Sequence, residues 1–274
     1  MRRAEFPAEE LARAKLTMSL RVEGTRSDGY HLINSIMVNL ELADRLTFSR
    51  GTGLEVKTDF GSGGHVGEPI PPDRTNLVER ALDIVDIGAH VLLEKRIPAG
   101  AGLGGGSADA AAVLRWAGFD DLQRAATLGA DVPFCLIGGA AKVSGVGEII
   151  EPIDFAKRHI VLLTPPFGMS TVAVYYEWDR MGGPTGEGPN DLESAAISLE
   201  PRLTYWRDVL EQLVGRRPVM AGSGSTWFAE LDADPQSLGI SGTLAQARAE
   251  LAAQGALLTV TSTQDPISES PDSA

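Results

Sequence analysis

The stretch PAGAGLGGGSA at residues 98–108 carries the strongest indication of fold and function in this sequence. It has five glycines in eleven residues and leads directly into an alanine-rich segment. Glycine allows positive φ angles and close approach of the backbone to a ligand, while consecutive amides and a helix N-terminus attract phosphate oxygens. We therefore predict a phosphate-binding loop. A mobile linker is the alternative, but linkers rarely run straight into an apolar helix that begins with serine.

Two familiar nucleotide-binding patterns can be compared with this stretch. Gly100, Gly102 and Gly105 match G-x-G-x-x-G, and Asp120 follows at the distance of a ribose-binding acid. The dinucleotide fold, however, places that acid at the end of a strand, whereas Asp120 opens a helical pattern after a glycine. The sequence G-K-[ST] is missing from the stretch, which excludes a P-loop.

The surrounding sequence predicts strands and helices in mixed order. Residues 16–22 and 36–48 alternate apolar and polar side chains around the turn residues Asp28 and Gly29, which is typical of an antiparallel pair. Helical spacing and strand-like runs then follow each other along the chain. We expect helices at 75–86, 107–116 and 120–128, the last capped by Asp120, and strands at 90–95 and 140–144, with LGADVPF at 128–134 forming a turn.

The pattern restarts near residue 155 and predicts a second α+β unit. Its expected strands are 159–164, 219–220, 226–231 and 257–260, and its expected helices are 171–181, 202–214 and 243–253. Glycine and proline predict loops at 61–72 and 182–189. We therefore divide the chain into domains at 1–154 and 155–261, followed by a polar, proline-containing tail at 262–274 that we expect to be disordered.

Composition places the chain among ordinary globular proteins. It has 274 residues, of which 43% are hydrophobic and 22% charged, and a formal net charge of −13. This charge disfavours broad attraction to nucleic acid or anionic lipid. The single cysteine, Cys135, allows no intramolecular disulfide, no apolar run has the length of a membrane helix, and the N-terminus has no export signal. We expect a cytoplasmic protein.

Four separated motifs together resemble the GHMP small-molecule kinases. Besides residues 98–108 they are AKL at 14–16 with DGYH at 28–31, LGADVP at 128–133 and AGSGS at 221–225. They occur in the family's order and spacing over most of residues 14–231. The resemblance implies an α+β fold of two domains, the first similar to domain 2 of ribosomal protein S5 and the second ferredoxin-like.

The resemblance also implies phosphoryl transfer from ATP with Mg²⁺. In it, Asp131 is the catalytic aspartate, which accepts the alcohol proton, and Lys15 lies beside it and orients its carboxylate. Taken alone, Asp131 would be a turn or cap residue and Lys15 a lysine at a strand edge. Ser107 is a candidate to contact a metal-bound phosphate, to cap its helix, or to do both. The expected ATP-binding residues are Pro98, Ala99, Gly100, Ala101, Gly102, Leu103, Gly104, Gly105, Gly106, Ser107 and Ala108.

Within this family, DGYH, LGADVPF, GVGE at 145–148 and NDLE at 190–193 resemble members that phosphorylate the 2-hydroxyl of a cytidine diphosphate derivative. The resemblance implies that Tyr30 and His31 hold the cytosine and that Tyr175 stacks on it. A hairpin turn and plain helix packing are the alternative uses of these residues. Thr17 stands where the family usually has a substrate-binding asparagine, and the segment 116–120 is shorter than usual.

Two other functions stay open at this point. One is a GHMP kinase acting on homoserine or mevalonate, which Tyr30, His31 and the NDLE segment disfavour. The other is a catalytically silent nucleotide-binding protein, suggested by Thr17 and disfavoured by the presence of both Lys15 and Asp131. The expected partners are the small-molecule substrate alone, without nucleic acid or membrane, and the chain is expected to be a monomer or homodimer.

Overall fold

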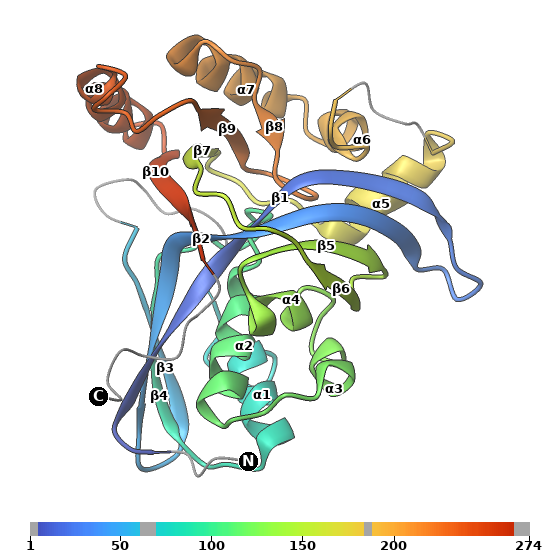
Figure 1. Cartoon of the computed structure of the whole chain (residues 1–274), viewed down its shortest axis with the longest axis vertical. Coiled ribbons are helices and arrows are strands. Elements are labelled where there is room, and N and C mark those ends of the chain that lie inside the picture. The colour runs from blue at the N-terminus through green and yellow to red at the C-terminus, as the bar shows by residue number, and fades with distance from the viewer. Residues whose placement is uncertain (1–4, 61–69, 184–187, 266–274) are drawn as a thin grey trace.

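A long β-hairpin is the central element of the first half of the fold (Figure 1). The computed structural model describes residues 5–60, 70–183 and 188–265. Strands β1 (Ala8–Thr25) and β2 (His31–Ser49) pair antiparallel, as predicted, and are longer than predicted. Strands β4 (His90–Lys95) and β5 (Ala140–Gly145) also pair antiparallel with β2. Two strands that the sequence did not predict complete this sheet, β3 (Gly53–Thr58) parallel to β4 and β6 (Ile149–Pro152) antiparallel to β5.

Four helices pack together in this half of the molecule (Figure 1). They are α1 (Leu77–Val85), α2 (Gly105–Trp116), α3 (Leu122–Ala126) and α4 (Val132–Ile137). The alanines of α2 are buried, and small side chains let α2 lie close to β1, α1 and α4. Phe48, Leu93 and Phe134 belong to the core cluster of this half. The glycine-rich stretch is therefore fixed at both ends, by β4 before it and by α2 after it.

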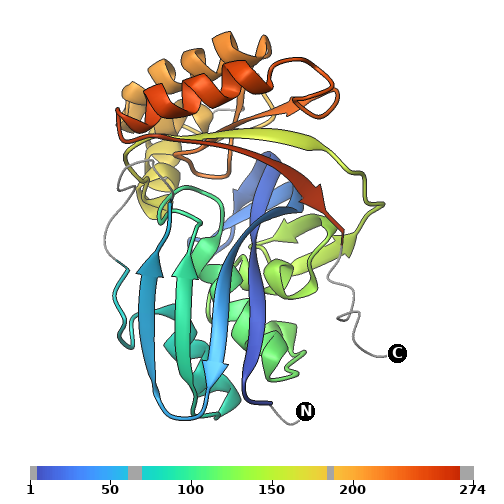
Figure 2. The same ribbon diagram turned by 90° about the vertical axis from the view of Figure 1, so that its left-hand side faces the viewer.

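The second half has its own antiparallel sheet and core. Its strand order is β10 (Leu257–Gln264), β7 (His159–Thr164), β9 (Trp227–Leu231) and β8 (Val219–Met220). Helices α7 (Arg202–Val214) and α8 (Ser241–Ala252) lie over one face of β7 and β10, as Figure 2 shows. Helices α5 (Thr171–Arg180) and α6 (Glu193–Leu199) complete this half, whose core includes Trp206 and Trp227.

Strand β10 joins the two sheets, and this corrects the prediction that disorder begins at residue 262. Thr263 and Gln264 pair with Leu40 and Asn39 of β2. Thr263 is 2% exposed, and its hydroxyl accepts from Arg158 N and donates to Ala156 O. Polar side chains can occupy a buried strand when such partners satisfy them. The remainder of the predicted tail, 266–274, lies outside the described residues.

Other sequence predictions need smaller corrections. The expected turn at LGADVPF continues into helix α4, and α3 is capped by Asp121, whose carboxylate accepts from Arg124 N, and not by Asp120. Helix α2 begins at Gly105, two residues before the predicted start, and α6 was not predicted. Most of the predicted loop at 61–72, and 184–187 of the loop at 182–189, lie outside the described residues. Within the described ranges, no helix is long and apolar enough to cross a membrane.

Candidate active site

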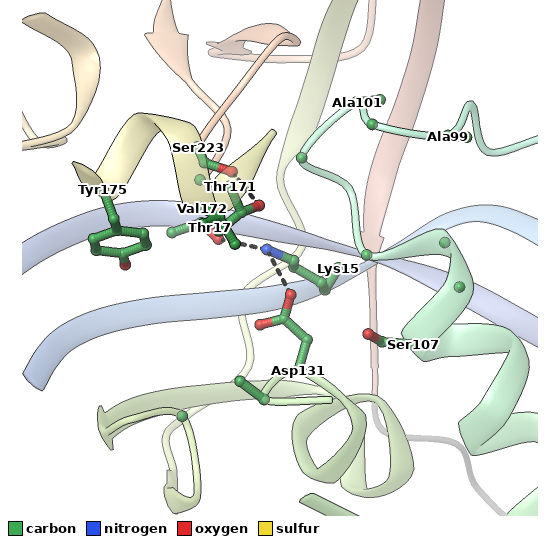
Figure 3. Close-up of a pocket in the computed structure, with 18 of the residues that line it drawn as sticks. Lys15, Thr17, Ala99, Ala101, Ser107, Asp131, Thr171, Val172, Tyr175 and Ser223 are labelled. Carbon is green, nitrogen blue, oxygen red and sulfur yellow. Dashed lines mark hydrogen bonds and ion pairs between the residues drawn. The ribbon is translucent and has the colours of Figure 1, made fainter. Parts of the chain in front are cut away.

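A cavity of about 950 Å³ lies between the two halves of the molecule and is bordered by nearly every residue that the sequence analysis selected. Lys15, Thr17, Tyr30, His31, Asp131 and Tyr175 line it, together with most of the glycine-rich stretch. Leu103 and Ala108 do not line it; both are 1% exposed, and their side chains pack in the core. In Figure 3, Tyr175 lies on one side, Ala99, Ala101 and Ser107 on the other, and Lys15 with Asp131 between them.

The glycine-rich loop presents backbone to the cavity. Gly104 is the N-cap of α2, with a φ of 67°, and the structure gives it no side-chain cap hydrogen bond. The first-turn amides of α2 are thus not capped by a side chain and face the cavity side of the loop, where they can attract an anion. Ser107 is the third residue of α2, so the prediction that it caps the helix is wrong. Its predicted contact with a metal-bound phosphate stays a prediction.

Lys15 and Asp131 are brought together from distant parts of the chain. Lys15 Nζ lies 3.2 Å from Asp131 Oδ2, and the side chains are 7% and 29% exposed. Lys15 N donates to Leu103 O at 3.0 Å, and a Cβ on Gly104 would lie 2.6 Å from Lys15 Cγ. The lysine is therefore packed directly against the glycine-rich loop. Lys15 thus contacts the glycine-rich loop through its backbone and aliphatic stem, and Asp131 through its ammonium.

Asp131 has the backbone position of a helix cap without acting as one. It is the N-cap of α4, but its carboxylate makes no cap hydrogen bond and meets Lys15 instead. The backbone of α4 therefore aims the carboxylate into the cavity (Figure 3). The alternative that Asp131 is an ordinary cap residue fails on this geometry. An acidic group held beside an ammonium and partly open to the cavity is suited to accept a proton from a bound alcohol.

Two aromatic side chains stack at the other end of the cavity. The rings of His31 and Tyr175 have centroids 4.6 Å apart and an interplanar angle of 27°. His31 Nε2 lies 2.9 Å from Asp179 Oδ1, and burial raises the pKa of the Tyr175 hydroxyl. Tyr30 stands at the rim, 62% exposed. These surfaces offer a flat base both stacking area and hydrogen-bonding groups.

The sequence analysis did not select Asp179, although its spacing from Tyr175 could have indicated that the two side chains lie together. It lies four residues after Tyr175 on α5, and side chains so spaced share one face of a helix. His31, on β2, then completes a contact that no local pattern predicts.

A second loop closes over the lysine from the other half of the molecule. Asn190 is buried, and its Nδ2 donates to Met220 O at 2.8 Å and to Gly222 O at 2.7 Å. Ser223 Oγ lies 2.8 Å from Thr171 Oγ1, and a Cβ on Gly222 would lie 3.4 Å from Lys15 Nζ. The NDLE segment thus anchors the loop at 221–225, which explains why two motifs far apart in the sequence occur together.

A buried ionic cluster beneath the glycine-rich loop was also missed. Lys95 Nζ contacts a carboxylate oxygen of Asp44 and lies 2.7 Å from Asp109 Oδ2. Asp44 Oδ1 accepts from Ile97 N at 2.8 Å, so it holds the start of the loop, while Asp109 belongs to α2 at the loop's end. All three side chains are at most 3% exposed. Since β2, β4 and α2 each contribute one residue, no local sequence pattern points to this cluster.

The Asp109 carboxyl is expected to make stability depend on pH. Burial raises its pKa to about 8, although Lys95 opposes the shift, so between pH 4 and 8 the folded state binds one more proton than the unfolded state. Stability is therefore highest at the acidic side of this window and falls as pH rises through it, at most on the order of 1 kcal/mol per pH unit. Asp109→Asn, which cannot ionise, should show a flatter dependence.

Urea unfolding of both proteins at pH 5.5 and 8.5 measures this difference, since the two proteins differ at this cluster alone. If the free energy of unfolding fell equally in wild type and Asp109→Asn between pH 5.5 and 8.5, the prediction that Asp109 is protonated in the folded protein would be wrong. Asp109→Leu serves as the matched control, because it also cannot ionise but leaves Lys95 with Asp44 alone and should lose stability at both pH values.

Metal-binding groups are sparse in the described part of the chain. Nowhere in the described residues do three His, Cys, Asp or Glu side chains cluster as a metal site would require. The side-chain oxygens that line the cavity include those of Ser107, Asp109 and Asp131. Such a site suits a hard cation that arrives on phosphate oxygens and takes few protein ligands.

Comparison with known proteins places these features in a family context. The protein-family model described as GHMP kinases N terminal domain matches residues 76–139 of this chain. A 4-diphosphocytidyl-2-C-methyl-D-erythritol kinase of Paracoccus denitrificans (strain Pd 1222) is 36% identical over 239 residues, covering 80% of this chain and 85% of the relative. One from Polaromonas naphthalenivorans (strain CJ2) is 38% identical over 258 residues, covering 81% and 86%.

Solved structures agree with the sequence relatives. A crystal structure of 4-(cytidine 5'-diphospho)-2C-methyl-D-erythritol kinase matches with a TM-score of 0.72 and 32% identity, covering 93% of this chain and 99% of that one. A homoserine kinase from Cytophaga hutchinsonii matches with a TM-score of 0.51 and 13% identity, covering 97% and 98%. The second similarity shows the shared fold alone.

Proposed function

This chain belongs to the 4-diphosphocytidyl-2-C-methyl-D-erythritol kinase family and has the GHMP kinase fold, and we propose that it transfers the γ-phosphoryl group of ATP to the 2-hydroxyl of 4-diphosphocytidyl-2-C-methyl-D-erythritol. The observation that carries the proposal is the placement of Lys15 and Asp131, 3.2 Å apart, between a glycine-rich anion loop and a stacked aromatic pair. A substrate with a base at one end and an alcohol toward the other end fits this order.

The proposed ATP site is the glycine-rich loop with the first turn of α2. Its amides would bind phosphate oxygens, and its glycines leave room for the triphosphate. At Gly106, for example, a Cβ would meet only Leu77 Cδ1, at 3.5 Å, among the residues that the structure describes. Mg²⁺ carried by ATP would be held mainly by phosphate oxygens, with the Ser107 hydroxyl as protein donor, and would offset phosphate charge.

The proposed substrate site begins at the aromatic pair. The cytosine would pack with Tyr175 and His31, with Tyr30 at the rim, and Asp179 would hold the His31 ring in place. This arrangement is what favours a cytidine-containing acceptor over homoserine or mevalonate, which have no aromatic base to stack.

In the proposed step, the substrate hydroxyl oxygen attacks the γ-phosphorus while the bond from phosphorus to the β,γ-bridging oxygen breaks. The hydroxyl proton passes to the Asp131 carboxylate, and the electron pair of the broken bond leaves with ADP. The Lys15 ammonium orients Asp131 and stabilises negative charge that develops beside the loop. Asp131 and Lys15 therefore both act on the substrate hydroxyl oxygen, which loses its proton and forms the new bond to phosphorus.

Finer features belong to the same proposal. We assign residues 1–154 to an S5 domain 2-like unit and 155–261 to a ferredoxin-like unit, whose last strand β10 continues to Gln264. In support, one core cluster lies within the first half and a second lies mostly within the second half, with Leu20 and Val22 of β1 added to it. The product would serve non-mevalonate isoprenoid synthesis in the cytoplasm, with the chain acting as a monomer or homodimer.

The proposed function is tested by ADP release from the purified protein. With ATP and Mg²⁺, the kcat/KM for 4-diphosphocytidyl-2-C-methyl-D-erythritol should exceed that for homoserine or mevalonate by at least about 100-fold, because the latter leave the base-binding groups unpaired. Phosphorus NMR of the product should show a new monophosphate ester. Preference for homoserine or mevalonate would instead assign another GHMP activity, and absence of turnover with all three would assign a silent homologue.

A further inference from the structure

Thr17 is the residue at which this chain departs from the usual family pattern, and its hydroxyl has a specific partner. Lys15 Nζ donates to Thr17 Oγ1 at 3.2 Å (Figure 3). Thr17 is 1% exposed, and a Cβ on Gly222 would lie 3.7 Å from Oγ1. The hydroxyl is thus enclosed by the lysine and the loop at 221–225, at the edge of the cavity.

The register of β1 explains why the two side chains meet. Lys15, Leu16 and Thr17 pair in unbroken register with Asn39, Val38 and Met37, while register shifts occur on both sides of this segment. Alternate residues of a regular strand point to the same face, so Lys15 and Thr17 face the cavity together. Leu16, between them, is fully buried on the opposite face.

We propose that Thr17 is a positioning residue, whose hydroxyl holds the Lys15 ammonium against Asp131; the inference rests on the proposed kinase function. An ammonium has three N–H groups, and within the described residues Thr17 and Asp131 are its partners. The third N–H then points a donor at a ligand. Threonine suits this use because its β-branch restricts χ1 and keeps the acceptor in place.

The role differs from that of a substrate contact, the role that the family resemblance implies for this position. The Thr17 oxygen lies within hydrogen-bonding distance of the lysine, so its loss should act first on Lys15. A shift of about 1 Å in a reacting group can cost about 100-fold in rate. The chemical step should therefore suffer, and the affinity for either substrate should not.

The test compares Thr17→Val, which keeps the shape and removes the acceptor, with Thr17→Ser, which keeps the acceptor. Thr17→Val should lower kcat about tenfold with both KM values within about twofold of wild type, and Thr17→Ser should stay within about threefold in kcat. Thr261→Val is the matched control, because Thr261 is a 9%-exposed threonine of β10 outside the cavity and should keep wild-type kcat.

Three results would overturn the inference. They are a raised KM for the cytidine substrate with an unchanged kcat in Thr17→Val, wild-type kinetics in that variant, or an equal loss of kcat in Thr17→Val and Thr17→Ser. Should Thr17→Val fail to fold, Thr17→Ala against Thr17→Ser makes the same comparison, since these two differ by the hydroxyl alone.

A chemical readout separates this inference from the proposed function. To attack an anhydride, the lysine nitrogen must lose a proton and turn its lone pair toward the reagent, and the hydrogen bond that Lys15 Nζ donates to Thr17 opposes both. Brief treatment with acetic anhydride should therefore label Lys15 about threefold faster in Thr17→Val than in wild type or Thr17→Ser, as followed by peptide mass spectrometry. Equal labelling in all proteins would reject the role of Thr17. Faster labelling in a protein without turnover on the cytidine substrate would support that role and reject only the proposed function.

Discussion

Asp131→Asn should lower kcat for phosphoryl transfer by about 10³-fold and leave the affinity for an ATP analogue within about twofold of wild type. General bases contribute roughly 10²–10⁴-fold to catalysis, and an amide cannot accept the hydroxyl proton. Asparagine has nearly the same shape as aspartate, and its oxygen can still accept from Lys15. The fold and the proposed phosphate-binding loop should therefore be unchanged, because Asp131 makes no cap hydrogen bond to α4.

The measurement pairs steady-state turnover with calorimetric binding of a non-hydrolysable ATP analogue. Asp120→Asn is the matched control. Asp120 is exposed and lies beyond the C-terminal end of α2, and a helix of twelve residues is about 18 Å long, so Asp120 is remote from the loop. This control should retain wild-type kinetics, which would also exclude the dinucleotide-binding alternative. Turnover near the wild-type value in Asp131→Asn would remove Asp131 from its role.

The sequence predicted much of this site because single motifs occupy single elements. The glycine-rich stretch contains its own helix start, and alternation at 16–22 and 36–48 predicted the central parts of the two strands that carry Lys15 and His31. The contact between Lys15 and Asp131 could not be predicted from a single element in this way. Nothing in the spacing of the two residues along the chain fixes their distance, and the expectation came from resemblance to a family whose motifs occur in the same order.

The features that sequence reasoning missed share a physical cause, which is that non-local contacts outweigh local preference. Helix α4, VPFCLI, is apolar all round because it is buried, so it shows no helical periodicity. Residues 262–264 are polar and resemble a tail, yet β2 and Arg158 supply their partners. The cluster of Asp44, Lys95 and Asp109 likewise exists only once three elements pack.

The glycine-rich loop must also fit the second half of the molecule, and Gly102 is where this fit is closest. Its φ is 77°, and a Cβ there would lie 2.2 Å from Ala221 O and 2.8 Å from Gly224 O. Next to it, Thr226 N donates to Ala101 O at 3.2 Å. Because both obstructing atoms are backbone, no side-chain rotation can make room for a methyl group.

Gly102→Ala should therefore lower the free energy of unfolding by about 3 kcal/mol or more. This combines roughly 1–2 kcal/mol for a left-handed conformation with roughly 1–3 kcal/mol for overpacking. ATP-analogue affinity should fall at least about tenfold, since the loop can relieve the clash only by moving away from the loop at 221–225 and so losing its phosphate-binding shape. Urea unfolding measures the free energy of unfolding, and calorimetry at low temperature, where the variant stays folded, measures the affinity for the ATP analogue.

Gly242→Ala is the control for a glycine substitution as such. Gly242 lies in the first turn of α8, far along the chain from the cavity lining, and a Cβ there meets nothing within 4 Å. Alanine at this position should raise stability by up to about 1 kcal/mol and leave ATP binding unchanged. If Gly102→Ala behaved like this control, the close fit of the two loops would not be what shapes the phosphate site, and the proposed cradle would have to be independent of the C-terminal half.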